Sequence, residues 1–286
     1  METILWVIIM TAIAGVGGTG LGGIVGASMK HDSKKIASLM LSFAAGIMLS
    51  IVCFDLIKDA LHPQNSAQPI SIWIVILGVF VGYGVIYLLN SAIDKATNHE
   101  IAHIDSDHPK TADDLDELFH ENHYEEHKSK NSIPDLLIGG IVMACAIALH
   151  NLPEGMVIGA SYAGETFAEN AFSGSGFIMA IVIGLHNIPE GMAVSVPLIS
   201  GGMSKIRAVL LTAMTGAPTI IGAVIGYYLG ILNPLMLSLS LSFASGAMLY
   251  VVFGELLPES ILMWKSKAPG FITIVGVMVG LLISNI

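Results

Sequence analysis

The chain has 286 residues, of which 54% are apolar and only 12% are charged, and its mean hydropathy is +0.76. Soluble domains carry about a quarter charged residues, so this composition excludes a solvated globular protein and indicates an integral membrane protein. The net charge is −10, and residues 94–130 contribute most of it, with 11 acidic residues against 4 lysines. Because the imbalance is acidic, we expect no nucleic-acid partner.

Eight apolar segments are long enough to be transmembrane helices, each of which needs about 20 residues. We expect them near residues 3–29, 36–60, 70–93, 134–160, 174–200, 204–230, 234–257 and 269–286. They are too long and too uniformly apolar for barrel strands, and lipid cannot satisfy the edges of an open sheet. The sequence therefore predicts an all-α membrane protein with eight helices. Cys53 and Cys145 lie inside these segments, and we expect both to be small buried hydrophobic residues.

The basic residues predict how the helices are oriented. With eight helices, 11 of the 12 lysines and arginines fall on one side, and only Lys58 falls on the other. The eleven are Lys30, Lys34, Lys35, Lys95, Lys110, Lys128, Lys130, Lys205, Arg207, Lys265 and Lys267. Since short cytoplasmic loops are rich in lysine and arginine, this side is expected to be cytoplasmic and both termini extracytoplasmic. A bacterial inner (plasma) membrane is the simplest location.

The sequence repeats itself at an offset of 200 residues. LSFAAGIMLSIVCFDLI at 41–57 matches LSFASGAMLYVVFGELL at 241–257, and the glycine spacing of 18–26 recurs at 222–230. The first three segments thus resemble the last three in order, and they enter the membrane from opposite sides. With an inverted pair between them, the predicted architecture is 3+2+3, which is typical of transporters. The glycine spacing alone could merely serve close helix packing.

The fourth and fifth segments each contain the motif HNxPEG, as HNLPEG at 150–155 and HNIPEG at 186–191. Each motif places a histidine and a glutamate four residues apart, and therefore on one helical face, with an asparagine beside them. The candidate ligands are His150, Asn151, Glu154, His186, Asn187 and Glu190. Pro153 and Pro189 each remove a backbone amide, so we expect both helices to kink at the motif and to offer a free carbonyl.

These residue types at bilayer depth predict a metal site. An ionised side chain there costs at least about 2.5–3.5 kcal/mol, so two buried glutamates need a cation or protons. Imidazole and carboxylate ligands suit zinc or iron better than calcium or magnesium. A single histidine or glutamate could be a hydrogen-bonded core residue, but two copies of the motif favour a metal site between helices four and five.

The eight segments, the two HNxPEG motifs and the histidine-rich loop before the first motif resemble the ZIP (Zrt-, Irt-like) family of divalent metal transporters, in particular its bacterial branch. The resemblance implies transport of zinc, or of iron, manganese, cobalt or cadmium, into the cytoplasm by alternating access. It also implies a homodimer in the lipid bilayer. The metal is then the transported substrate, and we expect no organic cofactor.

The resemblance also implies roles for single residues. The histidines and glutamates of the motifs, His150, Glu154, His186 and Glu190, would form a first metal position, and the asparagines with the same glutamates, Asn151, Glu154, Asn187 and Glu190, a second. Met48 fits a thioether ligand of the first position and could equally be a core methionine. Asp55 matches the entrance of the pathway and Glu255 its exit, although either could be an interface group at a helix end.

One position departs from the family pattern. Many members carry a glutamate before a proline in helix six, where this chain has Ala217 before Pro218. The second metal position therefore lacks an anionic ligand. We expect it to bind metal more weakly, or the protein to work with one principal site. Thr219 could supply a hydroxyl instead.

The loop between helices three and four holds six of the ten histidines, His99, His103, His108, His120, His123 and His127. Its polar, acidic composition indicates a flexible segment. Weak metal binding is the favoured interpretation, and a passive linker is the alternative. The chain is thus divided into 1–93 with helices one to three, 94–133 as this loop, 134–200 with the metal site, and 201–286 with helices six to eight.

Two other functions compete with transport. An intramembrane metal-dependent hydrolase could use Glu154 or Glu190 as a base, but neither motif-bearing segment contains HExxH and a catalytic centre needs no duplicated motif. A metal sensor that does not transport is the second alternative. The ATPase motif GxxxxGK[ST] is absent from the sequence, so ATP-driven pumping by this chain is not expected. We therefore expect a transporter and no enzyme.

Overall fold

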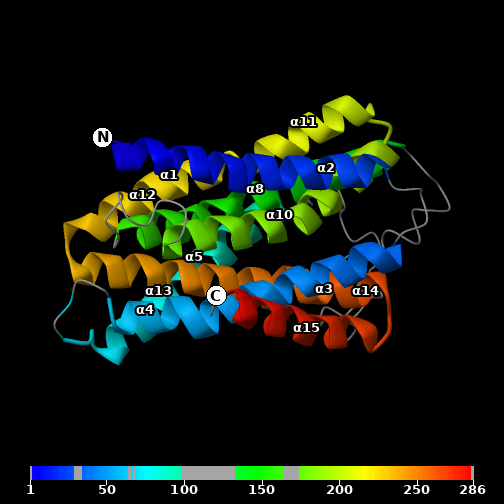
Figure 1. The fold of residues 1–286 in the computed structure, drawn as a ribbon. Helices are drawn as coiled ribbons and strands as arrows, with labels where there is room; N and C mark the ends of the chain where they lie inside the picture. Colours follow the sequence, from blue (N-terminus) through cyan, green and yellow to red (C-terminus); the bar gives the residue numbers. More distant parts are fainter. Residues whose placement is uncertain are drawn as a thin grey trace.

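The computed structural model describes residues 2–28, 34–63, 66, 68–97, 133–163 and 174–284. Every regular element in these ranges is helical, and the helices form a bundle (Figure 1). Seven helical segments are long and apolar enough to cross a membrane, namely Thr3–Ser28, Ser38–Leu61, Ile72–Ala92, Met143–Ala163, Ser175–Ser200, Lys205–Leu232 and Pro234–Leu262. The shorter apolar helix Ala268–Ile283 occupies the eighth expected segment. The prediction of an all-helical fold is confirmed for the described residues, and their apolar helices are compatible with a membrane protein.

Three of these segments contain a turn of π-helix. The first consists of α1 (Glu2–Ala12), η1 (Ile13–Gly17) and α2 (Gly18–Ser28). The second consists of α3 (Lys34–Ser50), η2 (Ile51–Leu56) and α4 (Ile57–Leu61). The seventh consists of α13 (Pro234–Val251), η4 (Val252–Leu256) and α14 (Leu257–Met263). Single π turns change which side chains share a helical face, and they occur often at functional sites.

The sixth segment is broken into two helices, which the sequence analysis did not predict. They are α11 (Lys205–Thr215) and α12 (Pro218–Leu232). Pro218 begins α12, where its missing amide costs no hydrogen bond. The remaining helices are α5 (Ile72–Thr97), α8 (Ile133–Ala163), α10 (Ser175–Ser200) and α15 (Ala268–Ile283). The two motifs lie on α8 and α10, which stay helical through Pro153 and Pro189.

Glycine brings helix backbones into direct contact at several interfaces. A Cβ atom added at Gly155 of α8 would lie 1.9 Å from the carbonyl oxygen of Thr219 on α12. One added at Gly22 of α2 would lie 2.1 Å from the carbonyl oxygen of Ile188 on α10. The same kind of approach joins α3 to α15 and α5 to α13, at Gly46, Gly276, Gly82 and Gly246. Small residues are how membrane helices pack closely, because lipid supplies no hydrophobic driving force between them.

The two motif-bearing helices form the centre of the bundle. Helix α8 packs against α10, α12 and α13, while α10 packs also against α2 and α3. In Figure 1, α1, α2, α11 and α12 lie along one side of this pair, and α3, α4, α13, α14 and α15 lie along the other. The main apolar core includes Met48 of α3, Ile158 of α8, Ile183 of α10 and Met248 of α13. The HNxPEG motifs are therefore enclosed by helices from both ends of the chain.

The outside of the bundle is apolar, as a surface in contact with lipid must be. Trp73, Phe80 and Ile206 are 74%, 72% and 75% exposed. Cys53 and Cys145 also lie on this outer surface as free thiols, so the prediction that both are buried is wrong. The sequence could not separate the two cases, because lipid and protein interior both favour apolar neighbours.

The described basic residues gather near one end of the bundle. Helix α2 ends there, and α3, α11 and α15 begin there, opposite the N-terminus (Figure 1). Lys34 and Lys205 are the first residues of α3 and α11, and Lys267 caps α15. Lys58, by contrast, lies in α4, next to the other end.

Candidate metal centre

The six polar residues of the two motifs lie in the interior of the bundle. They come from the middle of α8 and α10, and none is more than 2% exposed. Burial of this kind removes the water that would otherwise solvate two carboxylates, two imidazoles and two amides. Such groups need other partners, and an unpaired buried charge is costly. What each of them contacts therefore decides what the site can bind.

Glu154, His186 and Glu190 form the central group. Each offers one ligand atom, and these atoms all lie within 4.8 Å of one another. His186 Nε2 lies 3.0 Å from Oε1 of Glu154. The second oxygen of Glu154, both carboxylate oxygens of Glu190 and Nδ1 of His186 have no hydrogen-bond partner among the described residues. Two carboxylates and one imidazole in this arrangement match the nitrogen and oxygen ligands that zinc takes in proteins.

His150 is turned toward another part of the bundle. Its Nε2 lies 2.8 Å from Oε2 and 2.9 Å from Oε1 of Glu255, and its Nδ1 has no partner within the described ranges. Glu255 belongs to η4, and its side chain is 17% exposed. The sequence analysis named both residues but did not predict that they pair. The three residues of the central group are thus brought together without His150.

Asn151 makes three hydrogen bonds, two of them to residues beside the break between α11 and α12. Its Nδ2 donates to the carbonyl oxygens of Ile147 and Thr215, both at 3.0 Å. The hydroxyl of Thr219 donates to its Oδ1 at 3.2 Å. Ala217, directly before Pro218, is the N-cap residue of α12 and adds no polar side chain. Asn151 therefore ties α8 to the broken segment in this structure.

Asn187 makes a similar hydrogen bond to η1, the π turn in the first segment. Its Nδ2 donates to the carbonyl oxygen of Ala14 in η1 at 3.2 Å. Its Oδ1, unlike that of Asn151, is buried and has no partner in the part of the chain that the structure describes. The two asparagines of the repeated motif thus differ, since the side-chain oxygen accepts a hydrogen bond in Asn151 and has no partner in the described structure in Asn187. No pattern in the sequence signalled the carbonyl groups at η1 and at the break in the sixth segment.

The other predicted residues lie in helices around this centre. Met48 is fully buried in the main apolar core, and its part as a metal ligand stays a prediction. Asp55 lies in η2, where its Oδ2 accepts a hydrogen bond of 2.5 Å from the hydroxyl of Ser284. Its place at an entrance also stays a prediction. The six loop histidines, His99, His103, His108, His120, His123 and His127, lie outside the described residues.

Comparisons with known proteins agree with these features. A family model described as "ZIP Zinc transporter" matches residues 90–284. The chain is 32% identical to the "Zinc transporter ZupT" of Clostridium perfringens over 267 residues, which cover 91% of this chain and 88% of that protein. It is 34% identical to the "Zinc transporter ZupT" of Chlorobium luteolum over 259 residues, which cover 88% of this chain and 87% of that protein.

A third relative aligns along almost the whole of both chains. It is the "Zinc transporter ZupT" of Akkermansia muciniphila, 31% identical over 291 residues that cover 100% of this chain and 97% of the relative. The family match includes both HNxPEG motifs and more than half of the chain. The chain therefore belongs to the ZIP zinc transporter family.

Proposed function

We propose that this protein transports zinc across the membrane into the cytoplasm, with Glu154, His186 and Glu190 as the central site. The proposal rests on one observation, which is that these three ligands are fully buried and lie within reach of a single cation. The unpartnered oxygens of Glu190 are explained by a cation that binds there and leaves again. Membership in a family of transporters supports the same function and argues against an enzyme.

Zinc occupies one principal position in this proposal. Asn187 is the amide best placed to join the central group, because its oxygen has no partner in the described structure. His150 joins when its ring leaves Glu255, and Met48 is a further candidate ligand. The second position is weak, since Asn151 is held by three hydrogen bonds and Ala217 has no ligand atom. Selection among zinc, iron, manganese, cobalt and cadmium then depends on the two imidazoles.

The 3+2+3 inverted repeat belongs to this proposal, and the packing of the helices supports it. Helix α2 packs on α10 as α12 packs on α8, and α3 packs on α15 as α13 packs on α5. In the repeat, the first three segments correspond to the last three, and α8 corresponds to α10. The contact of α2 with α10 therefore corresponds to that of α12 with α8, and the contact of α3 with α15 to that of α13 with α5. The π turns η2 and η4 also lie at matching positions of the repeat. Two inverted halves around a buried site allow access to alternate between the two sides. Kinks at Pro153 and Pro189 stay a prediction.

The orientation in the membrane is also proposed. The end of the bundle that is rich in lysine and arginine is cytoplasmic, so both termini are extracytoplasmic in a bacterial inner membrane. The loop of residues 94–133 is then cytoplasmic, and its histidines can receive zinc that leaves the central site. The proposed repeat and orientation also divide the chain into four parts, which are helices one to three, the loop, the metal site, and helices six to eight. A homodimer, implied by the family resemblance, completes the proposal.

Zinc-65 uptake into proteoliposomes tests the function directly. We expect uptake by the wild-type chain and none by the Glu154→Gln/Glu190→Gln variant, in which the amides keep the size of the side chains but remove both charges. Cys145→Ala, on the outside of α8, is the matched control and should transport normally. Folded wild-type protein that binds zinc without moving it would support a sensor or a hydrolase instead.

A further inference from the structure

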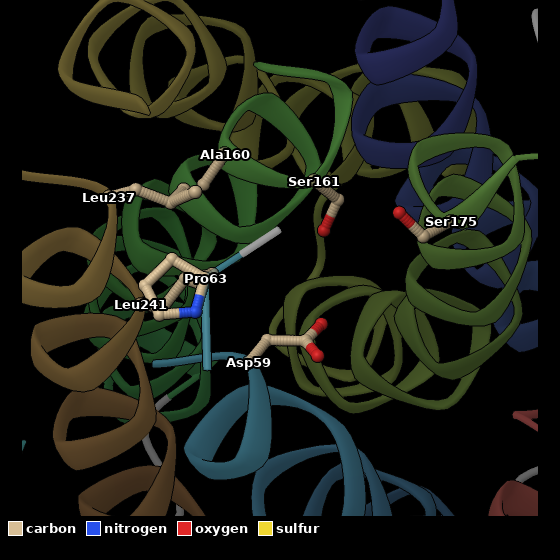
Figure 2. A pocket seen from close by; sticks show the side chains of 7 residues that line it. All are labelled: Asp59, Pro63, Ala160, Ser161, Ser175, Leu237 and Leu241. Carbon is tan, nitrogen blue, oxygen red and sulfur yellow. The ribbon is translucent and has the colours of Figure 1, made fainter. Parts of the chain in front are cut away.

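A second polar site lies apart from the central group. It is a cavity of about 20 Å³, and its lining residues are Asp59, Pro63, Ala160, Ser161, Ser175, Leu237 and Leu241. Figure 2 shows the carboxylate of Asp59 and the hydroxyls of Ser161 and Ser175 facing the space between them. A cavity of more than about 10–15 Å³ can hold one water molecule. The site is therefore large enough for a single water or a small cation next to three oxygen-bearing side chains.

The cavity lies at the end of the bundle that contains the N-terminus. Asp59 is near the end of α4, Ser161 is in the last turn of α8, and Ser175 begins α10. This is the end opposite the basic residues (Figure 1), and it is extracytoplasmic in the proposed orientation. Among the hydrogen bonds and ion pairs of the described residues, none involves the carboxylate of Asp59. A partly buried carboxylate without such a partner attracts cations.

The cavity also lies in line with the central group along both motif-bearing helices. Ser161 follows Glu154 by seven residues, which is about two turns and about 10 Å along α8. Ser175 precedes His186 by eleven residues, which is about three turns and about 16 Å along α10. Both intervals return to the same helical face. The cavity and the central group therefore lie along the same faces of α8 and α10.

We propose that Asp59, Ser161 and Ser175 form an outer cation site, which holds a partly hydrated divalent ion before the ion reaches the central group. This inference rests on the proposed transport function. The three side chains offer one carboxylate and two hydroxyls, with no imidazole or sulfur. Such an all-oxygen set also suits manganese, magnesium and calcium. The outer site therefore gathers divalent cations, while the central site selects zinc.

Binding at the outer site is weak, as a loading step requires. Only one formal negative charge faces the cavity. The C-terminal end of α8 favours a cation, but the N-terminal end of α10 opposes it. The neighbouring charges on the same segment are Asp55, one turn away and bonded to Ser284, and Lys58, which is exposed. A site with these opposing contributions can release its ion toward two carboxylates.

Zinc uptake at varied external concentration tests this inference. In Asp59→Asn we expect the apparent KM to rise about 3- to 10-fold with the maximal rate unchanged, and in Asp59→Glu we expect partial recovery. Glu259→Gln is the matched control, because Glu259 follows Asp59 by 200 residues and lies in α14, near the basic end. A wild-type KM in Asp59→Asn, or an equal rise in Glu259→Gln, would overturn the inference.

Direct binding separates this inference from the transport proposal. In the Glu154→Gln/Glu190→Gln background, which lacks both central carboxylates, manganese bound to the purified protein can be followed by electron paramagnetic resonance. We expect the number of weakly bound manganese ions per chain to fall by one on adding Asp59→Asn. Manganese binding that is unaffected by Asp59→Asn refutes the outer site even if zinc is transported. Binding that depends on Asp59 supports the site even if the wild type transports nothing.

Discussion

The imidazole of His150 and the carboxylate of Glu255 approach to 2.8 Å, although the residues are 105 positions apart in the chain. The pair joins α8, which carries the first HNxPEG motif, to η4. Nε2 of His150 can either hold a proton for Glu255 or present a lone pair to a metal, but not both. In the proposed function, coordination of zinc through this atom would require the pair to break, and reforming the pair would favour release of the metal.

The first prediction concerns this exchange. Glu255→Gln keeps the size of the side chain but removes the charge that competes with zinc for His150. We expect zinc to bind about tenfold more tightly, a change of about 1.4 kcal/mol, and the maximal uptake rate to fall. Calorimetry on purified protein and uptake at saturating zinc measure the two effects. Unchanged affinity together with an unchanged rate would show that the pair plays no part in release.

The second prediction concerns the contact between α8 and α12. A Cβ atom at Gly159 would lie 2.0 Å from the carbonyl oxygen of Ala223, so Gly159→Ala must force the two helices apart. We expect little folded protein by size-exclusion chromatography. Gly84→Ala is the matched control, because a Cβ atom at Gly84 meets nothing within 4 Å and alanine favours a helix more than glycine does. Normal yields of Gly159→Ala would contradict the backbone contact described for this interface.

The third prediction concerns the number of bound metal ions. We expect one tightly bound zinc per wild-type chain, because Asn151 is held by three hydrogen bonds and Ala217 offers no ligand. Ala217→Glu supplies the missing carboxylate and should raise the ratio toward two, measured by mass spectrometry of the metal content after desalting. Ala217→Gln has a similar size but no charge and should stay at one. Two tightly bound ions in the wild type would refute the single principal site.

The fourth prediction concerns the broken sixth segment. Thr219→Val removes the donor to Oδ1 of Asn151 and should cost about 1 kcal/mol of stability, a fall of about 2–4 °C in melting temperature for a chain of this size. Thr273→Val is the control, because the hydroxyl of Thr273 bonds only within its own helix, to Pro269. We expect a smaller fall there. Equal falls in the two variants would show that the bond to Asn151 contributes nothing specific.

Much of the fold could be predicted from local features of the sequence. Hydropathy located the eight helical segments, and the two HNxPEG motifs named Glu154, His186 and Glu190 as candidates, which the structure brings together in the buried interior. Features that depend on distant partners could not be predicted in this way. The pairing of His150 with Glu255 and the bonds of Asn151 and Asn187 to interrupted helices require the tertiary arrangement. The exposure of Cys53 and Cys145 on the outer surface was also not predicted, because residues that face lipid and residues in the protein interior are both apolar.

The carboxylate of Glu190 is buried, and neither of its oxygens has a partner in the described structure. This arrangement affects the stability of the folded protein. A ligand that binds only the folded state stabilises it, by about 2.7 kcal/mol when its concentration is a hundred times its dissociation constant. Zinc bound at this carboxylate, as the proposed function requires, would therefore stabilise the folded protein. The metal-free form would then be the less stable one, and we expect proteolysis of the purified protein to be faster without zinc than with it.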